Sequence, residues 1–356
     1  MRPERNFSIY PMKTIIALLL VAVWFPANGQ NLETPAPRPD PPLPYSATVD
    51  SSIPVYKPVK GLSGSLKGVE SNTVTAVTDA WIAGFTKIYP DVKISVDIGG
   101  SGQGGPRLTA GTADFGFIAR EMMGREETPF VDKFGYKPLA IAVSGGSLAV
   151  KAFTDCIVFI VNKDNPLEEV TFPQLDAIYS VTHNRGIKNP ITTWGQLGLT
   201  GEWADKPIHA WGVEIPNGYD TFVNMHVLAN GQWREGIQSQ HTVIPLSDKV
   251  AADKYAISYT GLAWDTNPNT KVLKLAVHPG DPFLAPTFEN VALQKYPLSR
   301  VIYIFINREP GKPINPVLRE FIRYALSQQG QQAIVQDRIF TPLPAALDAR
   351  ETEMLK

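Results

Sequence analysis

The chain has 356 residues, of which 44 % are hydrophobic and 10 % aromatic, so it is long enough to bury a core and to form one or two domains. Its formal net charge is −1 and it has no long run of like charge, which excludes nucleic acid as an expected partner. The single cysteine, Cys156, excludes an internal disulfide and lies in an apolar run typical of a buried, inert thiol.

Residues 1–29 have the pattern of a secretory signal peptide. Basic residues precede an apolar run over residues 15–25, which is shorter than the roughly 20 residues of a membrane span. Small residues follow at 27–29, so we predict a mature start at Gln30, with Met1 or Met12 as the initiator. No cysteine stands at the expected cleavage site just after the apolar run, where a lipid would be attached. We therefore expect a periplasmic or secreted protein that is not a lipoprotein. A retained interfacial anchor is the alternative.

Residues 30–58 are rich in proline and are predicted to form an extended tether. Such a composition does not build a core. Recognition of this segment by a polyproline-binding partner is an alternative.

Beyond residue 60, helical and strand patterns alternate. The expected elements are, in chain order, a helix over 74–88, strands over 94–98, 113–119 and 157–161, a helix over 173–180, a strand over 300–307 and a helix over 318–326. Such alternation predicts an α/β fold with mostly parallel sheets, and the length beyond the tether favours two lobes.

Motifs of catalysis and metal binding are missing from the sequence. The five histidines show no metal-ligand spacing, and neither a G-x-S-x-G elbow nor a Gly-Lys-Ser/Thr phosphate loop occurs. We therefore expect no enzyme, no metal and no cofactor.

A glycine-rich turn, "GGSGQGGPRL", follows the strand over 94–98. Gly100, Gly102 and Gly105 satisfy G-x-G-x-x-G, which is a fingerprint of dinucleotide binding. The helix that starts near Pro106 has room for only about seven residues, or roughly 10 Å, before the next strand. A dinucleotide-binding unit needs a longer crossover, so a free anion held by backbone N–H groups is the better interpretation.

A second stretch, "GVESNTVTAV", places Ser71, Asn72 and Thr73 at the start of the first helix. Two helix starts in one lobe are able to converge on one oxyanion. Ser71 is also the residue type of an ordinary helix N-cap, which is the alternative interpretation.

These stretches, together with "ADFGFIARE", "TTWGQLGLTGEW" and "YPLSRVIYIFIN", resemble the periplasmic phosphate-binding proteins of ABC transporters, a branch of the type 2 periplasmic-binding-protein superfamily. The resemblance covers residues 61–347 in the same order. It implies two α/β lobes, each a mixed, mostly parallel sheet flanked by helices, joined by two hinge crossovers. Lobe I is expected to comprise residues 59–149 plus 293–356, and lobe II residues 150–292. It also implies a monomer that delivers phosphate or a similar oxyanion to an ABC permease in the inner membrane.

The resemblance assigns the expected ligand-binding residues, with one departure. They are Ser71, Asn72, Thr73, Gly100, Ser101, Gly102, Gln103, Arg120, Asn217, Gly218 and Tyr219. The family usually places an arginine and then Ser-Gly-Thr in the third loop, where this chain has Gly212 or Val213 and then Asn217-Gly218-Tyr219. A guanidinium that binds an anion contributes about 1.5–3 kcal/mol per charge-assisted hydrogen bond.

Three readings of this departure stay open: weak phosphate binding through backbone groups, a different ligand, or a sensory or accessory protein that has altered or lost ligand binding. Glu70 and Asp220 would repel an anion if they faced the cleft, and the sequence does not say where they point.

Overall fold

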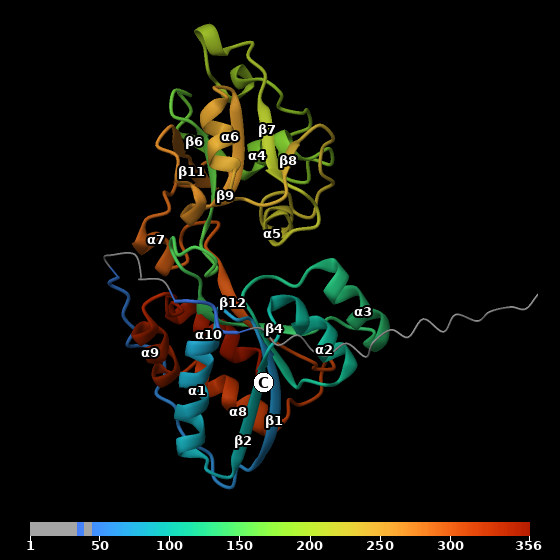
Figure 1. Ribbon diagram of the computed structural model, residues 1–356, viewed down its shortest axis with the longest axis vertical. Coiled ribbons are helices and arrows are strands. Elements are labelled where there is room, and N and C mark those ends of the chain that lie inside the picture. Colours follow the sequence, from blue (N-terminus) through green and yellow to red (C-terminus); the bar gives the residue numbers. More distant parts are fainter. Residues whose placement is uncertain (1–33, 39–44) are drawn as a thin grey trace, which may run out of the picture. The chain divides into compact units, whose positions relative to one another are not determined.

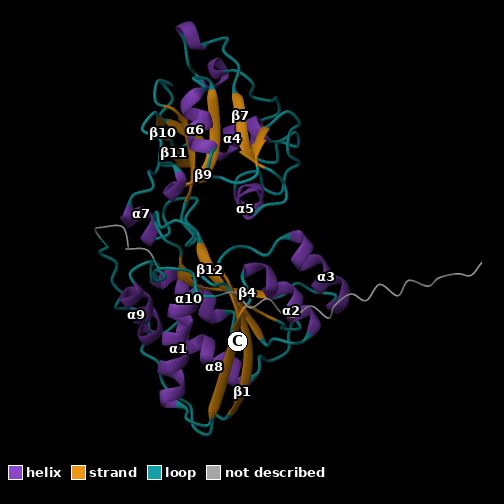
Figure 2. Cartoon of the chain, viewed as in Figure 1, coloured by secondary structure: helices purple, strands orange, loops and turns teal. Residues whose placement is uncertain are grey.

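Two five-stranded β-sheets, each with helices packed against it, organise the chain (Figures 1 and 2). The structure is a computed structural model that describes residues 34–38 and 45–356, and these residues belong to one compact unit. The expected signal peptide lies outside the described residues.

The first sheet has the strand order β2-β1-β3-β12-β4. Its strands are β1 (Gly64–Glu70), β2 (Val92–Ile98), β3 (Phe115–Ile118), β4 (Leu139–Gly145) and β12 (Val301–Ile306). The strands β1, β2 and β3 run parallel, whereas β12 is antiparallel to both of its neighbours. The carboxyl ends of β1, β2 and β3 therefore meet at one edge.

Both faces of the first sheet are covered, because side chains alternate along its strands. In β12, Ile302, Ile304 and Ile306 join one core, whereas Tyr303 and Phe305 pack with the other. The larger core includes residues of α1 (Thr75–Ile88), α8 (Pro316–Ala325) and α9 (Gln328–Asp337), and the smaller includes residues of α2 (Gly104–Ala110) and α3 (Gly124–Phe134).

The second sheet has the order β10-β5-β9-β7-β8 and a separate core. Its strands are β5 (Ile157–Asn162), β7 (His209–Val213), β8 (Gln238–Gln240), β9 (Ala256–Gly261) and β10 (Thr270–Val272). The associated helices are α4 (Phe172–Tyr179), α5 (Gly218–His226), α6 (Leu246–Ala252) and α7 (Phe288–Ala292), and β6 (Glu169–Thr171) pairs with β11 (Lys274–Ala276). Every residue of β5 is buried, as its unbroken apolar run predicts.

The mixed α/β fold with two sheets is confirmed, with one refinement. Each five-stranded sheet has two parallel and two antiparallel pairings, so parallel pairings are not in the majority in either. A last helix, α10 (Ala345–Glu353), contacts β4, where the Ala142 N–H donates to Glu351 at 3.0 Å. Among the described residues, no helix is long and apolar enough to cross a membrane.

Two segments connect the sheets and lie side by side. The chain passes from β4 to β5, and it returns from α7 to β12. The Gly146 N–H donates to the Arg300 carbonyl at 2.7 Å, and the Ile157 N–H donates to the Leu298 carbonyl at 3.2 Å. The resemblance implied such a pair of crossovers.

The described part of the proline-rich segment packs on the first sheet's helices, which differs from the extended tether we expected for residues 30–58. Ile53 and Tyr56 are buried, and the Tyr56 ring packs edge-on against Phe85. Further back, the Ala36 N–H donates to the Asn72 carbonyl at 2.8 Å, and Arg38 forms an ion pair with Asp337. Apolar residues between the prolines supply the contacts that the proline count concealed.

Candidate functional site

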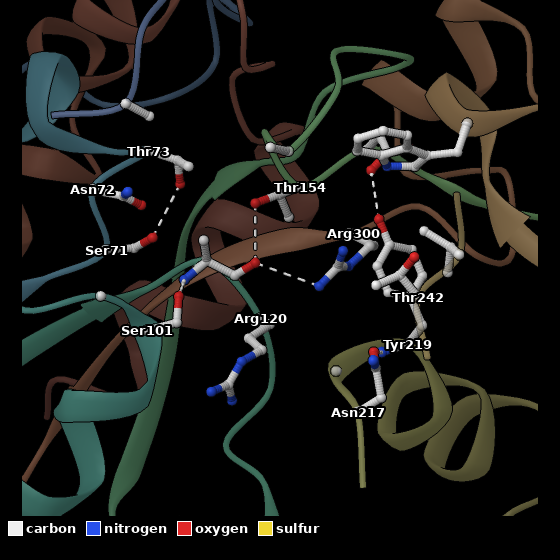
Figure 3. A pocket seen from close by; sticks show the side chains of 18 of the residues that line it. Ser71, Asn72, Thr73, Ser101, Arg120, Thr154, Asn217, Tyr219, Thr242 and Arg300 are labelled. Carbon is white, nitrogen blue, oxygen red and sulfur yellow. Dashed lines mark hydrogen bonds between the residues drawn. The ribbon is translucent and has the colours of Figure 1, made fainter. Parts of the chain in front are cut away.

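A cavity of about 580 Å³ opens where the carboxyl ends of strands from both sheets point (Figure 3). Residues that follow β1, β2 and β3 line it, and so do residues that follow β7 and β9. Ligands of open α/β sheets bind at such strand ends because the loops there are free to carry polar groups. All expected ligand-binding residues line this cavity except Gly102 and Gln103.

The first loop, Ser71–Thr73, is fixed between β1 and α1. The Ser71 N–H donates to the Phe117 carbonyl at 2.9 Å, and the Ser71 and Thr73 hydroxyls are 3.1 Å apart. One of these two hydroxyls therefore keeps its hydrogen for a ligand. The N-cap of α1 is Val74, without a side-chain bond, so Ser71 is not the ordinary cap we considered.

The second loop uses its glycines for two separate purposes. Gly100 has φ of 74°, a backbone conformation that favours glycine, and its N–H donates to the Glu70 carbonyl at 3.0 Å. A Cβ at Gly104 would lie 2.2 Å from the Ile118 side chain, so this glycine permits the close packing of α2 on β3. Ser101 accepts a hydrogen bond from the Ala119 N–H at 3.3 Å, which leaves the Ser101 hydrogen free to donate.

The helix after this loop, α2, has seven residues, the length that the sequence predicted. It is too short for the crossover of a dinucleotide-binding unit. The glycine-rich turn therefore fits a small anion better than a nucleotide.

Arg120 lies between the second and third loops. A Cβ at Gly218 would meet its side chain at 3.1 Å, and a Cβ at Gly102 would lie 3.9 Å from its guanidinium. The guanidinium donates to both carboxylate oxygens of Glu126, at 2.7 and 2.8 Å, and to the Glu121 carbonyl at 2.7 Å. Its positive charge is therefore largely neutralised within the protein.

The third loop begins α5. Asn217 is the N-cap, and its side chain accepts from the Tyr219 N–H at 3.0 Å. Asp220 accepts from the Asn217 N–H and is buried, so it completes a capping box and does not line the cavity. Neither Gly212 nor Val213 lines it, so the third loop brings no cation.

Sequence reasoning missed several polar residues that the crossovers and the second sheet bring to the cavity. Thr154 and Asp155 precede β5, Arg300 precedes β12, and Trp264 follows β9. Thr242, Val243 and Ile244 complete that side of the lining, with Ala36 and Ala152 elsewhere. Arg300 stands within the quoted stretch "YPLSRVIYIFIN", but nothing in the pattern of residues marked it as a ligand.

Asp155 is the acidic residue of the lining. Its carboxylate accepts from the Tyr219 hydroxyl at 3.2 Å and from the Ala263 N–H at 3.1 Å. Burial raises the pKa of Asp155 to about 6, although the nearby Arg300 charge opposes the rise. At neutral pH the cavity therefore holds both signs of charge.

Glu70 also lies away from the cavity surface. Its side chain is 4 % exposed at the end of β1, and burial raises its pKa to about 7. With Asp220 in its capping box, both acidic residues whose direction was open are outside the lining.

The lining has the chemistry of an oxyanion site. Hydroxyls, helix starts and two guanidinium groups surround the space, and these groups donate hydrogen bonds to anions. Over residues 34–38 and 45–356, no group of three or more His, Cys, Asp or Glu residues is placed to hold a metal ion.

Comparisons with known proteins identify the family of this chain. A family model described as the PBP superfamily domain matches residues 57–329. The phosphate-binding protein PstS of Pseudomonas aeruginosa is 35 % identical over 299 residues, which cover 84 % of this chain and 89 % of that protein. The phosphate-binding protein PstS of Staphylococcus haemolyticus is 27 % identical over 288 residues, 80 % of this chain and 83 % of that one. The crystal structure of PstS from Borrelia burgdorferi has the same fold, with a TM-score of 0.50 at 18 % identity, covering 79 % of this chain and 99 % of that one.

Proposed function

Because the chain belongs to the family described as the PBP superfamily domain, we propose that it is an extracytoplasmic solute-binding protein that captures phosphate or a similar oxyanion for an ABC transporter. The observation that carries this proposal is the convergence of three loop starts, at Ser71, Gly100 and Asn217, on one cavity. The relatives are named phosphate-binding proteins, which supports the same class of ligand for this chain.

In this proposal, the ligand is bound mainly by neutral donors. The N-terminus of α1 has no side-chain cap, so its first N–H groups lack partners within the helix, and Ser101 and one of Ser71 and Thr73 have hydroxyl hydrogens to give. Hydrogen bonds to an anion are stronger than those between neutral groups, so a few such donors suffice for specific binding.

We further propose that residues 59–149 plus 293–356 and residues 150–292 act as two lobes that close on the ligand. The separate cores of the two sheets and the paired crossovers support this division. The loaded form would then engage an ABC permease, with the binding protein acting as a monomer in the periplasm or outside the cell.

The direct test is calorimetric titration of phosphate into protein stripped of ligand by partial unfolding and dialysis, with sulfate as the comparison. We expect phosphate binding in the micromolar range or tighter. Absence of heat with both anions would contradict the proposal and would favour a sensory or accessory role on the same scaffold, which the missing third-loop arginine makes the second candidate.

A double variant tests whether the site is the one described. Ser71→Ala combined with Ser101→Ala removes two hydroxyls from the lining and should weaken phosphate binding at least tenfold. The matched control is Ser65→Ala combined with Ser95→Ala, which changes two exposed serines on β1 and β2 outside the cavity. Equal affinity in the two double variants would place the ligand elsewhere.

A further inference from the structure

The cavity has two guanidinium groups, and their charges are used differently. Arg120 is held by both oxygens of Glu126, a bidentate pair that satisfies most of its donors. For Arg300, no carboxylate oxygen lies within ion-pair distance anywhere in the described residues, although it too lines the cavity. The charge of Arg300 is therefore the less compensated of the two.

Arg300 also has donors to spare. Its side chain donates to the Ala119 carbonyl from Nη2 at a long 3.4 Å, and its buried Nε has no hydrogen-bond partner among the described residues. The residue is only 7 % exposed, so water does not satisfy these groups freely. A guanidinium has five N–H donors, and an unsatisfied buried donor costs about as much as a lost hydrogen bond.

The position of Arg300 is fixed by the groups around it. Its guanidinium lies over the rings of Tyr219 and Phe222 at the start of α5, with centroid distances of 5.7 and 5.5 Å. In Figure 3 it lies between Thr154 and Tyr219, beside the Ala119 carbonyl that Thr154 also donates to. Arg300 thus comes from a crossover segment and lies between the loop after β3 and the start of α5.

Two carboxylates share the electrostatic surroundings of Arg300. Its charge opposes the burial that raises the pKa of Asp155, and it adds to the effect of His226 in lowering the pKa of Glu121, but neither carboxylate is hydrogen-bonded to it. Asp155 is instead bonded to Tyr219 and Ala263, and Glu121 lies 3.5 Å from His226. These contacts orient the carboxylates and leave the guanidinium available to a ligand.

We propose that Arg300 binds an oxygen of the oxyanion directly and supplies the positive charge that the third loop lacks. This inference rests on the proposed function and adds a ligand-binding residue to it. The cation comes from the crossover before β12, next to the loop after β3, and the third loop contributes its helix start and the Tyr219 ring that supports Arg300.

Calorimetry on three variants tests the proposal. Arg300→Gln should weaken phosphate binding about ten- to a hundredfold, as expected for the loss of a charge-assisted hydrogen bond. Arg300→Lys keeps the charge without the planar fork and should recover part of this loss. The control, Arg234→Gln, changes another partly buried arginine that donates only to the carbonyls of Ala177 and Ile191 and does not line the cavity.

The outcomes separate this inference from the proposed function. Wild-type protein that binds no phosphate contradicts the function itself. Wild-type binding that persists unchanged in a folded Arg300→Gln variant overturns the role of Arg300 alone. Thermal unfolding of each variant shows whether it is folded.

A structure of the wild-type protein crystallised with phosphate provides a test that no variant's folding affects. We expect a phosphate oxygen about 2.7–3.2 Å from a nitrogen of Arg300. Phosphate bound in the cavity with Arg300 beyond hydrogen-bond distance would overturn the proposal.

Discussion

Replacing Glu70 by Gln should remove part of the pH dependence of this protein's stability. Glu70 is 4 % exposed, and burial raises its pKa from 4.5 to about 7, with the nearby Thr78 hydroxyl opposing the rise and the Asp79 charge adding to it. The folded state therefore holds the proton more tightly than the unfolded chain does. Stability from this group is complete below pH 4.5 and is lost as the pH rises through about 7.

The size of the effect follows from the two pKa values of Glu70. Each pKa unit corresponds to about 1.36 kcal/mol, so ionisation lowers the free energy of unfolding by about 3–4 kcal/mol in total, of which about 2–3 kcal/mol falls between pH 5 and pH 8. Glutamine is nearly isosteric with the protonated acid and does not ionise. The Glu70 carbonyl, which accepts from the N–H groups of Gly99 and Gly100, is unchanged by the substitution.

Urea unfolding at pH 5, 6, 7 and 8 measures this difference. We expect the Glu70→Gln variant to be more stable than the wild type at pH 8 and nearly equal to it at the lowest pH. Burial raises the pKa of Asp348 to about 7 as well, so the free energy of unfolding of the variant should still fall with rising pH, although less steeply than that of the wild type. The control is Glu235→Gln, which changes an exposed glutamate. If the free energy of unfolding of Glu70→Gln falls with rising pH as steeply as that of the wild type, the reasoning is refuted.

Two further predictions concern the described parts of the chain around the site. Tyr56→Ala should lower the free energy of unfolding by about 3–5 kcal/mol, because a buried ring and its hydroxyl contacts with Tyr89 and Glu320 are lost. Urea unfolding measures the change. If Tyr56→Ala lowers the urea midpoint no more than Tyr56→Phe does, the packing of this segment adds little to stability. Asn217→Ala should lower the free energy of unfolding by about 1 kcal/mol through the lost N-cap of α5 and should also weaken phosphate binding. Asn217→Ser should retain most of the stability and most of the affinity, as measured by thermal unfolding and calorimetry. An alanine variant with unchanged phosphate affinity would exclude the third loop from the site.

The residue pattern was sufficient for the local structure and for the first two loops, and the resemblance indicated the third. The helix over 74–88, the buried strand over 157–161 and the seven-residue helix after the glycine turn follow from periodicity and from the spacing of proline and glycine, which act within a few residues. Because β1, β2 and β3 are followed directly by their polar loops, the positions of Ser71 and Gly100 could also be predicted as site residues.

The proline-rich segment was misjudged for a physical reason. Composition reports what a segment is able to form alone, and eight prolines in residues 30–58 do exclude a helix or a core of their own. Whether Ile53 and Tyr56 are buried depends on how the helices of the first sheet are placed, and that placement is a property of the whole fold.

Only the tertiary structure decided the electrostatics of the site. Arg300 and Asp155 are 145 residues apart in sequence, yet the crossovers bring both into the cavity, whereas Glu70 and Asp220, which stand beside predicted site residues, do not line it. Charge acts through space and depends on burial, so the same residue type is a ligand donor at Arg300 in our proposal and a paired group at Arg120. The sequence determined which loops carry the neutral hydrogen-bond donors. The packing of segments that are distant in sequence determined which charged side chains line the same cavity.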